Sequence, residues 1–222
     1  MDMASSSQSL LRKTRSAAAR VVQGAVGVGS GVADITHDLR TSSLSITGPG
    51  LAVKGRFYPV RTLTADDTDK LLDFLQHGMS PESRRLRFMS AMPTVPESAA
   101  AWLADRDGRS RVALAALDPD DPARLAAIVE YANMPDGPPE VAFSVADRFQ
   151  GNGLGSTLLS MLATMSVAAG QPKWSCDVLA DNPGPMHILA KVGTVHVGDV
   201  VRGVRHATVE LEPTLLFGLT AQ

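Results

Sequence analysis

The sequence predicts a mixed α/β sheet. Two strand-like segments, residues 112–117 and 125–131, flank an Asp-Pro-Asp-Asp-Pro turn that would pair them as antiparallel neighbours. Strands and helices are interleaved around this hairpin in the order strand, two helices, three strands, helix, strand, helix, two strands. Because that order lacks the regular alternation of βα units, it favours a mixed sheet over a parallel one.

The first part of the patterned region is predicted to hold one strand and two helices. Residues 57–63 are strand-like, and Thr64 is a suitable N-cap for the helix that follows. Two aspartates lie in the first helical turn, where the helix dipole favours negative charge, and an apolar face at helical spacing begins at Leu71. Ser80 caps a second helix that Pro81 opens, since proline is tolerated at the first helical position.

The remaining elements follow from apolar patterning and turn residues. The strand at 140–146 leads through a glycine turn into a helix that ends near Gly170. After this helix come a strand at 174–179, a short helix at 182–192 and two strands at 195–201 and 204–211.

Composition limits the function classes. At 222 residues, with 44% apolar and 20% charged residues, the chain suits one globular domain with a tail, or at most two small domains. A net charge of −2 provides no field that would gather nucleic acid. No apolar run reaches the roughly 18 residues that a transmembrane helix needs. Cys176 is the only cysteine and the histidines are scattered, so we expect no disulfide, no metal site and a reducing, cytoplasmic setting.

Residues 1–55 are predicted to form a basic tail rich in serine, alanine and glycine. Four cations and no acid lie within residues 11–20, and glycines interrupt the small-residue run at 21–32. We expect the tail to be mobile or weakly helical, with an amphipathic helix that docks to a partner or membrane surface as the alternative. A Gly-Pro-Gly turn at 48–50 marks the change to the patterned domain.

The glycine turn at 150–156 is the most informative motif. Its sequence, Gln-Gly-Asn-Gly-Leu-Gly-Ser, lies between a predicted strand and a predicted helix. Glycines let the backbone approach a ligand closely, and the free N–H groups of the first helical turn favour an anion such as a pyrophosphate. The glycine spacing differs from that of a dinucleotide-binding fold, and no lysine is present for a nucleotide triphosphate loop.

With this context, the sequence resembles the GNAT acetyltransferases. Their signature is Gln or Arg, two residues, Gly, one residue, and Gly or Ala at the start of a helix. Gln150, Gly153 and Gly155 match it position by position. The resemblance extends from about Arg56 to Glu212, and it implies a catalytic domain at 56–213 followed by a short C-terminal tail at 214–222. It also implies a mostly antiparallel sheet of six to seven strands, with two splayed central strands and four flanking helices.

Two segments resemble the bacterial protein-lysine acetyltransferases in particular. They are Glu-Val-Ala-Phe-Ser-Val-Ala-Asp at 140–147 and Ser-Pro-Glu-Ser-x-x-x-Arg-Phe at 80–88. Some actinobacterial relatives carry a cyclic-nucleotide-binding domain, and the 55 residues that precede the domain here are too few for one. The resemblance therefore implies transfer of acetyl from acetyl-CoA, as a co-substrate, to a protein lysine.

The resemblance also implies which residues bind acetyl-CoA. The pantetheine arm would enter between the strands at 140–146 and 174–179, and a backbone N–H, that of Ser144, would polarise the thioester carbonyl. No metal or other cofactor is required. The implied cofactor-binding residues are Phe143, Ser144, Val145, Gln150, Gly151, Asn152, Gly153, Leu154, Gly155, Ser156 and Asn182.

Catalysis requires a base, because a lysine amine with an ordinary pKa of about 10.4 is mostly protonated at neutral pH. Glu140 is the candidate: it begins the strand that holds the cofactor and matches the glutamate of the lysine-modifying relatives. Asp147, His187 and Glu130 are weaker alternatives. Cys176 is expected to be a small buried hydrophobe and not a nucleophile.

Two departures from the family pattern leave alternatives open. The tyrosine that often protonates the leaving thiolate is replaced by Leu189, and a Pro-Gly-Pro insert follows Asn182. A small-molecule amine acetyltransferase and a non-catalytic regulatory protein that binds acyl-CoA therefore stay as alternatives to a lysine acetyltransferase. The chain is expected to be a monomer or a homodimer.

Overall fold

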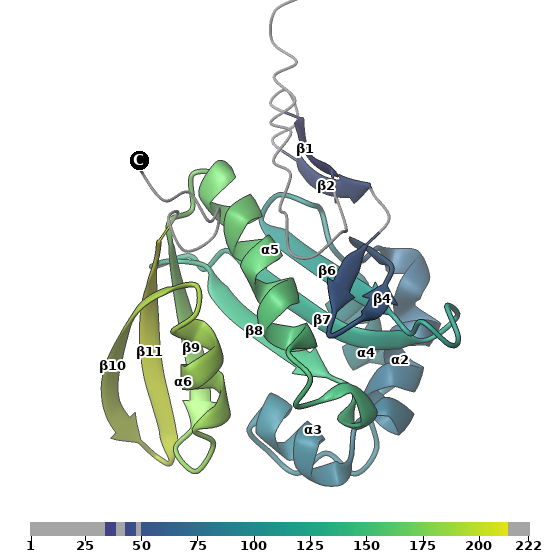
Figure 1. Cartoon of the computed structure of the whole chain (residues 1–222). Coiled ribbons are helices and arrows are strands. Elements are labelled where there is room, and N and C mark those ends of the chain that lie inside the picture. Colours follow the sequence, from purple (N-terminus) through teal and green to yellow (C-terminus); the bar gives the residue numbers. More distant parts are fainter. Residues whose placement is uncertain (1–33, 39–42, 48–49, 213–222) are drawn as a thin grey trace, which may run out of the picture.

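The computed structural model describes residues 34–38, 43–47 and 50–212. Its centre is a seven-stranded sheet with the order β10-β11-β9-β8-β7-β6-β5. Figure 1 shows this sheet with α5 lying across its middle strands and the hairpin β10–β11 set apart on the left. The strands of the sheet are β5 Val60–Thr62, β6 Arg111–Leu117, β7 Leu125–Ala132, β8 Glu140–Val145, β9 Lys173–Leu179, β10 Gly193–Val201 and β11 Val204–Leu211.

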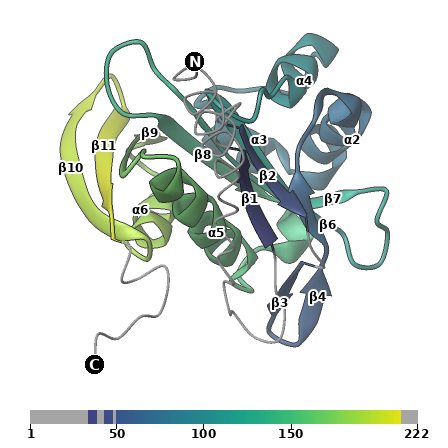
Figure 2. The same cartoon turned by 90° about the horizontal axis from the view of Figure 1, so that it is seen from above.

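Helices cover both faces of the sheet (Figure 2). Helices α5 and α6 lie on one face, and α2, α3 and α4 lie on the other. The helices among the described residues are α2 Thr68–Asp73, α3 Pro81–Phe88, α4 Glu97–Ala104, α5 Leu154–Ala168 and α6 Gly184–Leu189. Shorter turns of helix are η1 Ala65–Asp67, η2 Phe74–Gly78, which is π-helical, and η3 Asp147–Phe149. None of the described helices is long and apolar enough to cross a membrane.

The core forms where α5 packs on the central strands. Leu158, Leu162 and Met165 of α5 are fully buried, as are Ile128 and Val129 of β7. Because α5 is apolar on nearly all sides, it can pack against the sheet and against α6 together. The indole N–H of Trp174 is also satisfied, since Trp174 Nε1 donates to Ser166 Oγ at 2.9 Å. The helix that follows the glycine turn is therefore held rigidly.

The strands β8 and β9 separate in the middle of the sheet. Every other neighbouring pair in the seven-stranded sheet is antiparallel and extensively registered. The pair β8–β9 is parallel, and its register holds a single pair, Glu140 with Ser175. A further backbone bond joins Ser175 N to Pro139 O at 2.8 Å, at the same end. The predicted sheet with splayed central strands is thus confirmed.

The start of the domain differs from the prediction. Residues 51–53 form β3 (Leu51–Val53), which pairs with β4 (Arg56–Tyr58), so ordered structure begins before the expected residue 56. Leu51 and Val53 are buried in the core, which explains why this segment folds with the domain. A second hairpin pairs β1 (Asp34–Asp38) with β2 (Ser43–Thr47) within the expected tail. The basic stretch at 11–20, the small-residue run at 21–32 and the predicted tail at 214–222 lie outside the described residues.

Three further elements differ from the prediction. The first strand, expected at 57–63, is divided at Pro59 into β4 and β5, because proline has no N–H for a continuous ladder. Helix α4 was not predicted, although Ala100, Leu103 and Ala104 bury one face of it. The last helix is shorter than the predicted 182–192, since Pro183 and Pro185 restrict its start.

We predict that Leu158→Ala destabilises the protein by about 2–5 kcal/mol, because Leu158 is fully buried between α5 and the sheet. Urea denaturation followed by circular dichroism measures this free energy of unfolding. Ser160→Ala on the same helix is the control: its hydroxyl only donates to Ser156 O one turn back, so a loss below about 0.5 kcal/mol is expected. Equal losses for the two variants would contradict this account of the core.

Candidate functional site

A cavity of about 460 Å³ occupies the place where β8 and β9 separate. Its walls come from β8, β9, α3, the glycine turn and the segment that contains α6. All the residues predicted to bind acetyl-CoA, and the leading base candidate Glu140, line this one cavity. They are Glu140, Phe143, Ser144, Val145, Gln150, Gly151, Asn152, Gly153, Leu154, Gly155, Ser156 and Asn182.

The glycine turn has a conformation that requires glycine at two positions. Gly151 has φ 71° and Gly153 has φ 96°, both in the left-handed region that side chains with a Cβ disfavour. Asn152 Oδ1 accepts a hydrogen bond from Leu154 N at 2.9 Å, and Asn152 Nδ2 donates to Tyr58 OH at 3.2 Å. The side chain of Asn152 therefore stabilises the conformation of the turn. The first residues of α5 lie at the cavity wall.

Gln150 joins the turn to the strand before it. Its Nε2 donates to Val145 O at 3.0 Å and to Asp147 Oδ1 at 3.1 Å. Asp147 in turn accepts from Ser80 N at 3.0 Å and from Ser83 Oγ at 2.7 Å, at the start of α3. These bonds tie β8, the turn and α3 together. Because its oxygens are occupied in this way, Asp147 serves the geometry of the site and is a poor candidate for the base.

Two lysines stand on either side of the turn, and the sequence reasoning did not identify them. Lys54 Nζ lies 3.5 Å from Gly151 O, and Lys191 Nζ lies 3.5 Å from Ser156 Oγ. Lys54 follows β3 and Lys191 follows α6, so neither is near the turn in sequence. Both cations add to the positive end of the α5 dipole, which makes this end of the cavity suited to an anionic group.

The opposite end of the cavity carries carboxylates. Glu140 opens β8, about 17 Å along the strand from Val145 at an ordinary rise of roughly 3.3 Å per residue. Asp177 of β9 lines the same cavity, and its Oδ1 lies 2.6 Å from His206 Nδ1 on β11. Cys176, the residue before Asp177 on β9, also lines the cavity, and its pKa is raised to about 12 by burial and by the charges of Glu140 and Asp177. The carboxylates of Glu140 and Asp177 therefore both contribute negative charge near the Cys176 thiol.

The fold of this protein is similar to that of several solved structures. The GNAT domain of the Streptomyces lividans protein named PAT superimposes with a TM-score of 0.61 and 24% identity, over 81% of this chain and 97% of that one. Spermidine N-acetyltransferase from Vibrio cholerae, solved with CoA and spermine, gives a TM-score of 0.53 and 16% identity, over 72% and 98%. A GNAT-family acetyltransferase from Streptococcus pneumoniae gives a TM-score of 0.52 and 17% identity, over 70% and 99%. No protein-family model matches the sequence.

The protein has the GNAT fold. The structure and these comparisons confirm the fold that the glycine turn and the order of elements predicted. In this protein, the splay of β8 from β9 opens the cavity between the turn and Glu140.

The other predicted base candidates of this GNAT-fold protein are placed less favourably than Glu140. Both oxygens of Glu130 accept from guanidinium groups, one from Arg87 and one from Arg106. His187 is exposed on α6, where its Nδ1 lies 3.1 Å from Pro183 O, and it does not line the cavity. Leu189 occupies the position at which relatives often have the tyrosine that protonates the leaving thiolate. Its side chain is fully buried in the core.

We predict that Cys176 is unreactive in the folded protein, because burial raises the pKa of its thiol from 9.0 to about 12. Near pH 8 the folded protein then holds far less thiolate than the unfolded chain, and thiolate is the reactive form. Alkylation by iodoacetamide, measured by mass spectrometry, should be about a hundredfold or more slower for folded than for urea-unfolded protein. Comparable rates would show that the thiol is ionised and accessible in the cavity.

Proposed function

We propose that the protein is an acetyl-CoA-dependent N-acetyltransferase that acts on a protein lysine, with Glu140 as the general base. One observation carries the proposal: an anion-binding turn and a carboxylate lie at the two ends of one cavity, opened by the splay of β8 from β9. Such a cavity can hold an extended, anionic thioester and deliver its acetyl group to an amine.

The turn end of the cavity would bind the phosphates of acetyl-CoA. At the start of α5, Leu154 N donates to Asn152 Oδ1, whereas the N–H groups of Gly155 and Ser156 have no partner within the helix, as at any helix N-terminus, and would be available to the phosphates. Lys54 and Lys191 supply compensating charge on either side. The pantetheine arm would then follow β8, whose backbone groups on the β9 side lack a strand partner beyond Glu140.

Acetyl transfer requires that the amine and the thioester be held side by side and that a base accept the proton of the amine. Glu140 would accept a proton from the ammonium group, directly or through a water, so that the neutral amine attacks the thioester carbon. The Ser144 N–H would stabilise the negative charge that develops on the carbonyl oxygen. The carbon–sulfur bond then breaks, and coenzyme A leaves as a thiolate or thiol. Among the described residues Glu140 forms no ion pair, which leaves its carboxylate available.

Protein lysine is supported as the acceptor by two observations. The strand 140–147 and the segment 80–88 resemble those of bacterial protein-lysine acetyltransferases, and the S. lividans domain that this chain superimposes on belongs to a protein named PAT. Both segments line the same cavity, through Glu140 on one side and Ser83, Leu86 and Arg87 on the other. The acceptor would therefore enter between α3 and β9.

A polyamine acceptor is the second candidate, because one feature favours it. Glu140 and Asp177 place two carboxylates at the acceptor end of the cavity, and a polyamine has a second cationic nitrogen that one of them can bind. A solved structure with the same fold is a spermidine N-acetyltransferase in complex with spermine.

Replacing the proposed base should stop catalysis and leave cofactor binding intact. We predict that Glu140→Gln lowers turnover by about 10²–10⁴-fold, measured as thiol release from acetyl-CoA with a lysine peptide. The dissociation constant of acetyl-CoA, measured by calorimetry, should change by less than about twofold because the turn is untouched. Glu97→Gln, in the first turn of α4, is the matched control and should keep full activity. Full turnover by Glu140→Gln would exclude Glu140 as the base.

The two acceptor classes can be separated at Asp177. If a polyamine is the acceptor, Asp177→Asn should raise the KM for spermidine about tenfold, since the second nitrogen loses its counter-charge. If a protein lysine is the acceptor, wild-type protein should turn over a lysine peptide well and spermidine poorly. Steady-state rates with both acceptors decide between these outcomes.

A further inference from the structure

Two arginines share one glutamate beside the acceptor end of the cavity. Glu130 of β7 accepts from Arg87, near the end of α3, through one oxygen, and from Arg106, after α4, through the other. We call these three residues the arginine cluster. Their side chains are 15%, 9% and 3% exposed for Arg87, Glu130 and Arg106. The cluster is therefore nearly shielded from water.

Within its three residues, the arginine cluster has a net charge of +1. Arginine stays protonated in proteins, so two guanidinium groups face a single carboxylate. A further acid that acts on Arg106 is Asp105, which is highly exposed and pairs with Arg111 at 3.2 Å. Burial lowers the pKa of Arg106, as expected for a cation that is removed from water without full compensation.

Donor groups of the arginine cluster are also left without partners. The Nε atoms of Arg87 and Arg106 are buried, and neither has a hydrogen-bond partner among the described residues. A buried charge without full compensation and donors without acceptors both cost stability. An arrangement of this kind is expected where a ligand supplies the missing negative charge.

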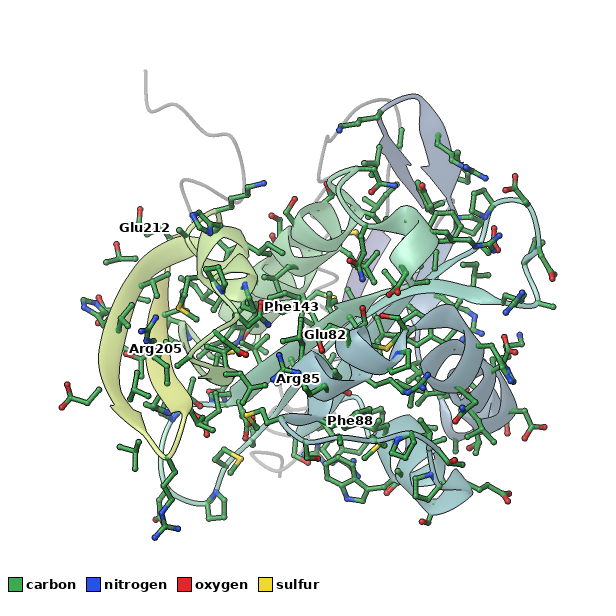
Figure 3. All side chains as sticks on the ribbon, turned by 90° about the horizontal axis from the view of Figure 1, so that it is seen from below. Glu82, Arg85, Phe88, Phe143, Arg205 and Glu212 are labelled. Carbon is green, nitrogen blue, oxygen red and sulfur yellow. The ribbon has the colours of Figure 1, made fainter. Side chains whose placement is uncertain are left out.

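The position of the arginine cluster indicates which ligand group would do so. Arg87 lines the cavity together with Glu140, whereas Arg106 and Glu130 lie behind it. The β7–β8 register pairs Glu130 with Ala142, two residues along β8 from Glu140, and Arg87 donates to Glu130, so Arg87 belongs to the Glu140 end of the cavity. Figure 3 looks onto this side of the molecule and labels Glu82, Arg85 and Phe88 of α3 together with Phe143 of β8, which lines the cavity.

We propose that the arginine cluster, through Arg87, binds a carboxylate of the acceptor next to the amine that Glu140 receives. This inference rests on the proposed acetyltransferase function and specifies its acceptor. The preferred acceptor is then a lysine with an acidic neighbour, in which the amine faces Glu140 and the carboxylate faces Arg87. A polyamine, which has no anionic group, would leave the charge of the arginine cluster uncompensated.

Short capped peptides test this proposal. Each contains one lysine, followed by glutamate in one peptide and by glutamine in the other. We expect wild-type protein to show about tenfold higher kcat/KM for the glutamate peptide, the size of effect expected from one charge-assisted hydrogen bond. Nα-acetyl-lysine against its amide forms a second pair, which shows whether a terminal carboxylate serves as well as an acidic side chain.

The variants are chosen so that folding is retained. Arg87→Gln leaves Glu130 paired with Arg106, a balanced pair, and should abolish the preference for the glutamate peptide. Arg106→Gln removes the excess charge without touching the cavity and should weaken the preference. Arg85→Gln is the control, because Arg85 lies on the same helix but pairs with Glu82 and Asp181 outside the cavity lining. It should keep the full preference.

Equal kcat/KM for the two peptides in wild-type protein, or a preference that survives Arg87→Gln, would overturn the proposal. Binding separates its failure from that of the proposed function. The dissociation constants of both peptides are measured by calorimetry in the presence of coenzyme A. Suppose that no peptide is acetylated but the glutamate peptide binds about tenfold tighter to wild type than to Arg87→Gln. The carboxylate-binding site is then supported and the acetyltransferase function is contradicted. If no peptide is acetylated and the two peptides bind equally, the carboxylate-binding site and the acetyltransferase function are both contradicted.

Discussion

The separation of β8 from β9 is the constraint on which the site depends. The two strands share one registered pair, Glu140 with Ser175, and then diverge, although every other pair in the seven-stranded sheet is extensively bonded. Backbone groups in the middle of a sheet are costly to leave without partners. The gap is therefore sustained by what surrounds it: α5 packs under β8, and the antiparallel pair β9–β11 holds the other side.

Helix α3 closes the gap from the opposite face, and polar contacts hold it there. The buried guanidinium of Arg84 donates to backbone carbonyls of residues 75, 76, 79, 92 and 93, which fixes the segments before and after the helix. At its start, Ser80 and Ser83 bond to Asp147, which also accepts from Gln150 of the glycine turn. The same helix carries Arg87 into the acceptor end of the cavity. Turn, helix and acceptor end are thus parts of one hydrogen-bonded assembly.

Most of the fold was predictable because its elements carry strong local patterns. The hairpin of β6 and β7 follows from apolar strands on either side of a proline- and aspartate-rich turn, and α5 follows from a long apolar run after glycines. Errors fell where local pattern is weak. Helix α4 was missed because its buried face is largely alanine, which scarcely contrasts with its surroundings. The start of the domain was placed late because β3 is only three residues long and becomes apolar core only through tertiary contacts.

The sequence by itself determined the turn and its partners along the chain. Gln150, Gly153 and Gly155 are close in sequence, and their geometry depends on local backbone freedom and on the adjacent strand and helix. Only the tertiary structure decided what meets at the other end of the cavity. Arg87, Glu130, Glu140 and Asp177 come from four different elements, and their charges matter through burial and distance, which no local pattern encodes. The cofactor end can therefore be read from the sequence, whereas the acceptor end is defined by long-range packing.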